Sequence, residues 1–365
     1  MQPKKTPLYE KHVENKGKVI DFAGWLLPVE YTSSLKETKA TRTTCGLFDA
    51  SHMGEIRVQG PQALEFLQAL TPNDISVTKP GQQQYNLFLN ENGGVIDDLM
   101  VYHEDKSYLC VVNASNKDKA LAWMLKRKSK FDVEITDKSD ETALLSLQGP
   151  TAVDVLRDIL GPKIDDVKYM HFSYFDLADT WIMVSRSGYT GEDGFELYTP
   201  SFRATAVWDM LLKAGAKHGL TLCGLGSRDI LRIEAGYPLY GHELNDDIDP
   251  YTASLGWVVK LNNKEFIAKT KLAAVKKNGP ARKRVGFVMQ ERAMVRQGYK
   301  IFVDGKEAGT VASGAFSPNA DKFVGMAFID SSAAVNGAAV EVEVRDLKYK
   351  AQVAKFPFVD IMTKK

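Results

Sequence analysis

The sequence predicts an α+β fold over the N-terminal two-thirds of the chain and a C-terminal β-barrel-like domain after it. Up to about residue 275, short apolar strands and amphipathic helices are mixed, without the regular strand–helix–strand alternation of a doubly wound sheet. Beyond Arg284 the chain is almost all strand, and Val340–Val344 alternates apolar and polar residues. We therefore expect one region over residues 1–275 and a separate domain over 284–365, joined by a basic segment with Gly279-Pro280.

Composition and charge exclude several classes of protein. The chain has 365 residues, 44% hydrophobic and 25% charged, with a net charge of +1. These values are typical of a globular protein with two or three domains, and they provide no general attraction for nucleic acid. The three cysteines are too far apart to predict a disulfide framework or a metal site. Because the sequence has no signal-peptide core and no apolar run of membrane-spanning length, we expect a cytoplasmic protein without membrane, nucleic-acid or metal partners.

The first half of the chain contains a hairpin and several helices. Pro61 at the first helical position, with leucines three residues apart from Leu64 to Leu70, predicts a helix. The turn residues Asn90–Gly94 between two apolar runs predict a β-hairpin. The elements expected here are a helix over 33–42, a strand over 55–58, a helix from 61, hairpin strands over 85–89 and 95–103, a strand over 108–112 and a helix over 117–128.

The second hairpin strand carries two adjacent carboxylates, Asp97 and Asp98. Side chains alternate along a strand, so the two point to opposite faces. Both faces are otherwise apolar, with Ile96, Met100 and Tyr102 expected beside Asp98, and Val95, Leu99 and Val101 beside Asp97. An ionised carboxylate is costly there unless it is hydrogen-bonded or paired. Either the pair marks a functional site, or one aspartate bonds to nearby backbone and the other reaches the surface.

The next part of the chain again mixes strands with helices. Pro150 opens a helix that Gly161 is expected to end. The elements expected are a strand over 143–147, a helix over 150–160, a strand over 181–184, a helix over 201–217 and a helix that begins near 226.

The loop from Gly188 to Glu196 packs three glycines and three acids into nine residues. Glycines allow a backbone to approach a ligand closely. Glu196, which lies between two apolar residues, is a candidate to accept two N–H bonds from a planar edge such as that of a pterin. For Glu192 and Asp193 we expect a solvated turn, because turns are commonly polar.

The segment Gly224–Arg228 opens a helix whose N-terminus favours anions. Arg228 is therefore a candidate to hold a carboxylate. The alternative is a surface cluster of Arg228 with Asp229, or of Arg232 with Glu234. Six aromatic residues are candidates for ring stacking, although the core is the favoured place for each one taken alone: Trp25, Tyr85, Tyr102, Tyr169, Tyr189 and Tyr237.

Five segments occur in the order seen in one enzyme family: Phe48–Gly54, Gly93–Leu99, Gly188–Glu196, Gly224–Asp229 and Leu239–Gly241. Through them the sequence resembles, from Thr6 to Phe358, the T-protein of the glycine cleavage system, a tetrahydrofolate-dependent aminomethyltransferase. The resemblance implies a three-domain fold. Two interleaved α+β domains and a C-terminal β-barrel-like domain would surround a central folate channel.

The resemblance also implies a reaction and its partners. An aminomethyl group on the lipoyl arm of H-protein would release ammonia, and its one-carbon unit would pass to tetrahydrofolate, giving 5,10-methylenetetrahydrofolate and dihydrolipoyl H-protein. Asp98 matches the family's essential aspartate, and Glu196 and Arg228 match folate-binding positions. The other matches are to channel-lining positions: Tyr85, Tyr102, Asn113, Tyr169, Tyr189 and Tyr237. Lipoylated H-protein and tetrahydrofolate are the expected partners, with no metal.

Two other functions compete with this one. A free-standing folate-dependent demethylase would take a methyl group from sulfur or nitrogen of a small molecule. A non-catalytic folate-binding protein would resemble the relative that maintains iron–sulfur proteins. That relative has Lys-Gly-Cys before the tyrosine that matches Tyr240, where this chain has Tyr237-Pro238-Leu239, and the intact Asp98 strand also argues against it.

The sequence departs from the family pattern at three places. Ser227 replaces the usual alanine, Ser317–Asp321 replaces a Ser-Pro-Thr motif, and Val359–Ile361 stands where some members have an arginine for the folate tail. A separate feature is the basic run formed by Lys276, Lys277 and Arg282–Arg284. It is either a solvated linker or a docking patch for an acidic carrier protein.

Overall fold

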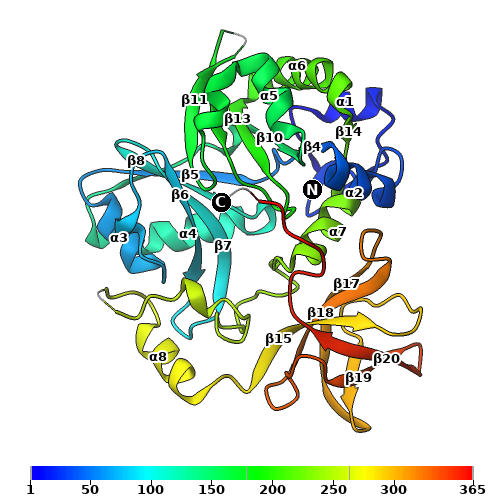
Figure 1. Ribbon diagram of the computed structural model, residues 1–365. Helices are drawn as coiled ribbons and strands as arrows, with labels where there is room; N and C mark the ends of the chain where they lie inside the picture. The colour runs from blue at the N-terminus through cyan, green and yellow to red at the C-terminus, as the bar shows by residue number, and fades with distance from the viewer. Residues whose placement is uncertain (1, 178, 263, 364–365) are drawn as a thin grey trace.

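The computed structural model describes residues 2–177, 179–262 and 264–363. Within these ranges the predicted fold class is confirmed: two larger sheets with helices form the N-terminal region, and a closed six-stranded barrel follows (Figure 1). A small three-stranded sheet at the N-terminus precedes them, with strand order β1-β3-β2. In chain order, its strands and the helices beside them are β1 (Lys4–Lys5), α1 (Tyr9–Glu14), β2 (Val19–Phe22), β3 (Trp25–Pro28) and α2 (Ser34–Thr43).

The first large sheet has six strands in the order β11-β12-β13-β10-β4-β14. They are β4 (Cys45–Asp49), β10 (Thr142–Gln148), β11 (Phe172–Asp176), β12 (Trp181–Ser185), β13 (Gly194–Pro200) and β14 (Leu220–Leu222). Helices α5 (Ala152–Leu160) and α6 (Ala204–Gly215) pack on one face of this sheet, where Leu156 and Trp208 join Leu145 and Leu197 in the core. Gly161 ends α5 as predicted.

The second large sheet has five strands in the order β6-β7-β8-β5-β9. They are β5 (Gly54–Gln59), β6 (Gln82–Leu89), β7 (Val95–His103), β8 (Ser107–Val112) and β9 (Glu134–Asp137). Helices α3 (Ala63–Leu70) and α4 (Lys117–Arg127) cover one face, through residues such as Phe66 and Met124. Because β4 belongs to the first sheet and the chain returns to it only at β10, the two sheets are interleaved in sequence.

The two sheets also share a buried core. Tyr102 and Val111 of the second sheet pack with Leu144, Met183 and Tyr198 of the first. Both sheets therefore hold the side chains at the edge of this shared core, and a site can form there between the two sheets.

The barrel closes in the order β15-β18-β17-β16-β19-β20. After α7 (Leu225–Ala235) and α8 (Lys269–Asn278), its strands are β15 (Arg282–Met289), β16 (Lys300–Val303), β17 (Lys306–Ser317), β18 (Lys322–Asp330), β19 (Ala339–Val344) and β20 (Leu347–Ala354). Helix α7 connects the barrel to the sheets, because Ile233 packs against Ala315, Val324 and Met326 of the barrel.

The C-terminal tail returns from the barrel to the N-terminal region (red in Figure 1). The backbone N–H of Phe358 donates to Glu234 O at 2.8 Å, and that of Met362 donates to Gly191 O at 3.0 Å. The tail therefore contacts both α7 and the glycine-rich loop of residues 188–196.

A β-bulge changes the expected faces of the Asp97–Asp98 strand. Phe88 pairs with Asp97, but Leu89 pairs with Val95, so Ile96 is an extra residue in the ladder. Ile96 consequently packs with Leu99 in the helix-covered core, and Val95 lies in a different cluster. The expectation that Ile96 lies beside Asp98 was wrong, since strict alternation fails at a bulge.

The structure divides the basic run among the end of a helix, a short connection and the start of a strand. Lys276 and Lys277 form the last turn of α8, and Arg282 already begins β15. Arg284 is only 5% exposed. The run is therefore built into a helix and a strand, and its last cation points into the protein.

Candidate active site

Asp98 lies in β7 with its carboxylate held by two donors. The Tyr85 hydroxyl donates to Oδ2 at 3.0 Å, and Asn113 Nδ2 donates to Oδ1 at 2.8 Å. The side chain keeps some exposure, whereas its neighbour Asp97 is fully buried. Burial raises the pKa of Asp98, and the accepted hydrogen bonds from Tyr85 and Asn113 oppose that shift. The result is a carboxyl group with both oxygens oriented by donors of the protein.

Asp97 is the anchor of this arrangement. Its Oδ2 accepts from the Asn113 backbone N–H at 2.9 Å, and its Oδ1 accepts from the side-chain amides of Asn113 and Asn116, both at 2.8 Å. Burial is the main cause that raises the pKa of Asp97, and the negative charge of Asp98 raises it further. Asp97 thus fixes the position of Asn113, and Asn113 in turn holds Asp98.

Glu196 lies in β13, across the strand pair from Ser185. Its Oε2 accepts from the Ser187 hydroxyl at 2.9 Å and from the Tyr102 hydroxyl at 3.2 Å. In the described parts of the chain, no donor contacts its Oε1, and the side chain is only partly buried. Tyr102 is itself fully buried, so only its hydroxyl reaches the site. One carboxylate oxygen is therefore held by two hydroxyl groups, and the other accepts no hydrogen bond from the described residues.

Arg228 lies in the first turn of α7, after Gly224 at the N-cap. Its guanidinium lies 5.0 Å from the centre of the Tyr189 ring, and it forms no ion pair with any carboxylate among residues 2–177, 179–262 and 264–363. Burial lowers the pKa of Arg228, and the negative charge of Glu196 raises it. The alternative pairing with Asp229 is not formed, because Asp229 accepts instead from Arg232 Nε at 2.8 Å.

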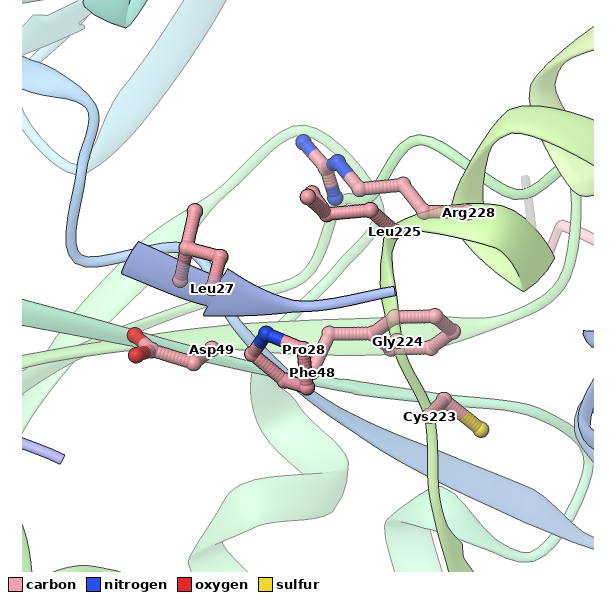
Figure 2. Close-up of a pocket in the computed structure, with 8 residues that line it drawn as sticks. All are labelled: Leu27, Pro28, Phe48, Asp49, Cys223, Gly224, Leu225 and Arg228. Carbon is pink, nitrogen blue, oxygen red and sulfur yellow. The ribbon is translucent and has the colours of Figure 1, made fainter. Parts of the chain in front are cut away.

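Figure 2 shows a small pocket beside Arg228, where β3, β4 and the start of α7 meet. The guanidinium lies on one side of the strand that carries Leu27, whereas Asp49 lies on the other side and points away from it. Asp49 is instead engaged by His12 Nε2 at 2.8 Å and by the Thr6 hydroxyl at 2.7 Å. The nearby carboxylate of Asp49 is thus unavailable to Arg228.

One stacked aromatic pair lies at the Arg228 end of the site and another at the Asp98 end. Tyr189 stacks with Tyr237 at a centroid distance of 5.9 Å and an interplanar angle of 27°. Burial raises the pKa of Tyr189, and the charge of Asp98 contributes in the same direction. Burial raises the pKa of Tyr237 to about 12, with a contribution from the partly buried Tyr169. At the Asp98 end, Tyr85 stacks on Trp257 at 5.8 Å.

The nine predicted site residues therefore fall into two linked groups. One contains Asp98, Tyr85 and Asn113, and the other contains Glu196, Tyr102, Arg228, Tyr189, Tyr237 and Tyr169. Tyr189 lies between them, within electrostatic range of both Asp98 and Arg228. The structure therefore brings these side chains together.

The expectation that Glu192 and Asp193 form a solvated turn was wrong. Glu192 is 3% exposed and accepts from Arg42 Nη1 at 2.9 Å, and Asp193 is 6% exposed and accepts from Arg186 Nη2 at 2.6 Å. Paired guanidinium groups compensate the cost of burying these carboxylates. The acids therefore fix the shape of the loop that leads to Glu196.

Sequence reasoning missed a second buried arginine near the site. Arg284 donates from Nη1 to Gly236 O at 3.2 Å, and its Nε has no partner among the described residues. Burial lowers the pKa of Arg284, while the charge of Glu243 raises it. The charge of Arg284 also acts on Tyr85, which contacts Asp98. The only sequence signal for its burial was the alternation of side chains along β15, and three successive cations at the start of that strand hide this alternation.

Comparison with known proteins gives concordant results. The family model described as "GCVT N-terminal domain" matches residues 8–263. The family model described as "Glycine cleavage T-protein C-terminal barrel domain" matches residues 282–360. The chain is 46% identical to a protein named aminomethyltransferase from Bacillus subtilis over 97% of this chain and 99% of the relative. It is 45% identical to one from Halalkalibacterium halodurans over 97% and 98%, respectively.

Among solved structures, the chain is similar to glycine cleavage system aminomethyltransferase T from Bartonella henselae. The TM-score is 0.93 at 36% sequence identity, and the match covers 99% of both chains. In the described part of this chain, no helix combines the length and apolarity needed to cross a membrane. The same residues contain no group of three or more His, Cys, Asp or Glu side chains suited to a metal ion.

Proposed function

The chain belongs to the glycine cleavage T-protein family, and from this premise we propose which of its residues carry the reaction. It is an aminomethyltransferase of the glycine cleavage system. The reaction releases ammonia from the aminomethyl group on the lipoyl arm of H-protein and transfers the one-carbon unit to tetrahydrofolate. The products are 5,10-methylenetetrahydrofolate and dihydrolipoyl H-protein.

Asp98 is the proposed catalytic residue. Forming the methylene bridge passes through a cationic iminium carbon, and a fixed carboxylate stabilises that charge and orients the attacking folate nitrogen. The observation that carries the proposal is the orientation of the partly exposed Asp98 carboxyl by Tyr85 and Asn113. A carboxylate held before the reaction begins needs little reorganisation as charge develops.

Glu196 and Arg228 are the proposed folate-binding residues. Glu196 Oε1, which has no donor among the described residues, suits an N–H edge of the pterin. Arg228, which has no carboxylate partner there, suits a carbonyl or acidic group of the folate. The stacked pair Tyr189–Tyr237 offers aromatic surface between these groups and Asp98.

Lipoylated H-protein is the proposed donor partner and tetrahydrofolate the acceptor, which is a substrate rather than a resident cofactor. We propose that no metal takes part and that the reaction takes place in the cytoplasm. The one-carbon unit passes from the lipoyl arm to the folate beside Asp98. H-protein must therefore dock where its lipoyl arm can reach Asp98.

The test is ammonia release measured with lipoylated, aminomethylated H-protein, with and without tetrahydrofolate. Release that requires both substrates supports the proposal, and Asp98→Asn should remove it. A demethylase would instead form methylated folate from a small methyl donor without H-protein. A non-catalytic binder would bind folate and release no ammonia from either donor.

A further inference from the structure

Two chains of hydroxyl groups converge on Oε2 of Glu196. In one chain, Gln83 Nε2 lies 2.8 Å from Ser185 Oγ, which lies 2.8 Å from Ser187 Oγ, and Ser187 donates to Glu196 at 2.9 Å. In the other, the Tyr198 hydroxyl lies 2.8 Å from the Tyr102 hydroxyl, which donates to Glu196 at 3.2 Å. In the first chain Gln83 lies in β6, Ser185 ends β12 and Ser187 lies in the loop after it, whereas in the second chain Tyr198 lies in β13 and Tyr102 in β7.

The direction of every bond follows from the charge of Glu196. An ionised carboxylate only accepts, and each hydroxyl has a single proton to donate. Ser187 donates its only hydroxyl proton to Glu196. Ser185 must therefore donate to Ser187 and accept from the Gln83 amide. By the same reasoning, Tyr198 donates to Tyr102. The amide of Gln83 therefore stabilises the one orientation of the serine hydroxyls that serves an ionised Glu196.

Both chains are shielded from water. Ser185 and Tyr102 are fully buried, Gln83 is 4% exposed, Tyr198 5% and Ser187 7%. Hydrogen bonds to a charged acceptor are stronger than neutral ones, and bonds in series polarise one another in a low-dielectric interior. Because Oε2 already accepts two hydroxyl donors, a ligand meets mainly Oε1.

We propose that Gln83, Ser185 and Tyr198 are positioning residues of the folate site, which act on the ligand only through Glu196. They hold its carboxylate in one orientation and turn Oε1 toward the ligand, so that the site selects a ligand edge that donates hydrogen bonds and disfavours one that accepts them. The inference rests on the proposed function, in which Glu196 binds the pterin.

A double-mutant cycle tests the inference. Tetrahydrofolate affinity is measured by calorimetry for Tyr198→Phe and Ser185→Ala, each made in the wild-type protein and in Glu196→Ala. In the wild-type background, each substitution should weaken binding about 3- to 10-fold, the effect of one hydrogen bond. In Glu196→Ala nothing remains to be positioned, so the same substitutions should change affinity by less than about 2-fold, which is within the usual limit of additivity.

Tyr174→Phe is the matched control, because it removes a hydroxyl that donates to Glu104 on the partly exposed strand β11. It should leave the affinity unchanged in both backgrounds. Equal losses for Tyr198→Phe and Ser185→Ala in both backgrounds would mean that they act through folding, and no loss in the wild-type background would also overturn the inference. Either result leaves the Glu196 assignment intact.

One further outcome would test the premise that Glu196 binds the pterin. If Glu196→Ala itself binds tetrahydrofolate with wild-type affinity, the proposed pterin contact fails and the inference fails with it. Ser185→Ala and Tyr198→Phe lie on separate chains, so a folding defect in one, seen by circular dichroism, leaves the other to decide.

Discussion

Asn113 Nδ2 lies 2.8 Å from Asp98 Oδ1, while the backbone N–H of the same asparagine is held by Asp97. One asparagine thus connects the buried aspartate to the partly exposed one. Adjacent carboxylates that point to opposite faces therefore have different tasks: Asp97 positions the asparagine, and Asp98 is the carboxylate that the asparagine holds.

Replacing Asp98 with alanine should abolish most turnover. We expect the rate of ammonia release to fall about 10²- to 10⁴-fold, because a positioned acid–base or electrostatic group is typically worth that much. Tetrahydrofolate affinity should stay within a few-fold of wild type, because the proposed binding contacts are at Glu196 and Arg228. Steady-state kinetics and calorimetry measure the two quantities, and a variant of normal rate would remove Asp98 from the mechanism.

Asp97→Ala should lose more stability than catalysis. It leaves the buried donors of Asn113 and Asn116 without their carboxylate, which we expect to cost about 2–4 kcal/mol in the free energy of unfolding. Urea unfolding of the variant beside Asp98→Ala gives the comparison. The reverse pattern, a stable protein with little activity, would mean that Asp97 is the reacting carboxylate.

Glu196→Gln should weaken tetrahydrofolate binding by about 1–3 kcal/mol, the range of a hydrogen bond to a charged group. Ser187 and Tyr102 would still donate to the amide oxygen, so the new NH₂ group would face the donor edge of the ligand. Arg228→Ala should also reduce the affinity. Calorimetry that finds both variants unchanged would leave the two residues with a structural role only.

The basic run is expected to guide the carrier protein, but only through its exposed members. Replacing Lys276, Lys277, Arg282 and Lys283 with serine should remove most of the salt dependence of H-protein affinity, because steering of charged partners weakens once the Debye length falls to about 8 Å. Affinity is measured at two or more salt concentrations. Arg284 is left in place because it is buried, and its loss would disturb the interior.

The tetrahydrofolate affinity of the same fourfold variant should change little with salt, which is its internal control. A variant with the wild-type salt profile for H-protein would show that the carrier docks elsewhere.

His52 should make the protein less stable as the pH falls from 6.5 to 4. Burial, followed by the charge of Arg228, lowers the pKa of His52 to about 4. At a pH between these two pKa values, His52 is protonated in the unfolded chain but neutral in the folded protein. The free energy of unfolding therefore decreases as the pH decreases. The loss between pH 7 and 5 should be about 2 kcal/mol.

His52→Gln supplies the comparison for this pH dependence. Urea unfolding at pH 7 and pH 5 should show a smaller difference in the variant, whatever its absolute stability. Equal differences in the two proteins would show that His52 does not carry the effect.

Much of the fold could be predicted because periodicity and turn residues are local properties. The helix after Pro61, the hairpin around Asn90–Gly94 and the helix that ends before Gly161 all formed close to the expected positions. The division of the chain between residues 275 and 284 stays a prediction. The bulge at Ile96 escaped because a bulge depends on the pairing of two strands, which one strand does not encode.

The candidate site was less predictable, because burial of charge depends on distant partners. Glu192 looked like a turn residue until Arg42, from a helix far earlier in the chain, was found beside it. Arg284 looked like part of a surface run because its neighbours are exposed. The residues alone made Glu196 and Arg228 candidates, whereas the choice of Asp98 over Asp97 came from a family motif, and the roles of all three stay predictions that the experiments above test.

The interleaving of the two sheets has a consequence for how the chain matures. Strand β4 is synthesised before the whole second sheet, yet its neighbours β10 and β14 come after that sheet. During synthesis β4 must remain unpaired on both edges, and pairing over long sequence separations is slow. A fragment that ends after β9 would have a complete second sheet and an orphaned apolar strand with two open edges. We expect such a fragment to aggregate rather than to fold, so the chain cannot be divided there into working halves.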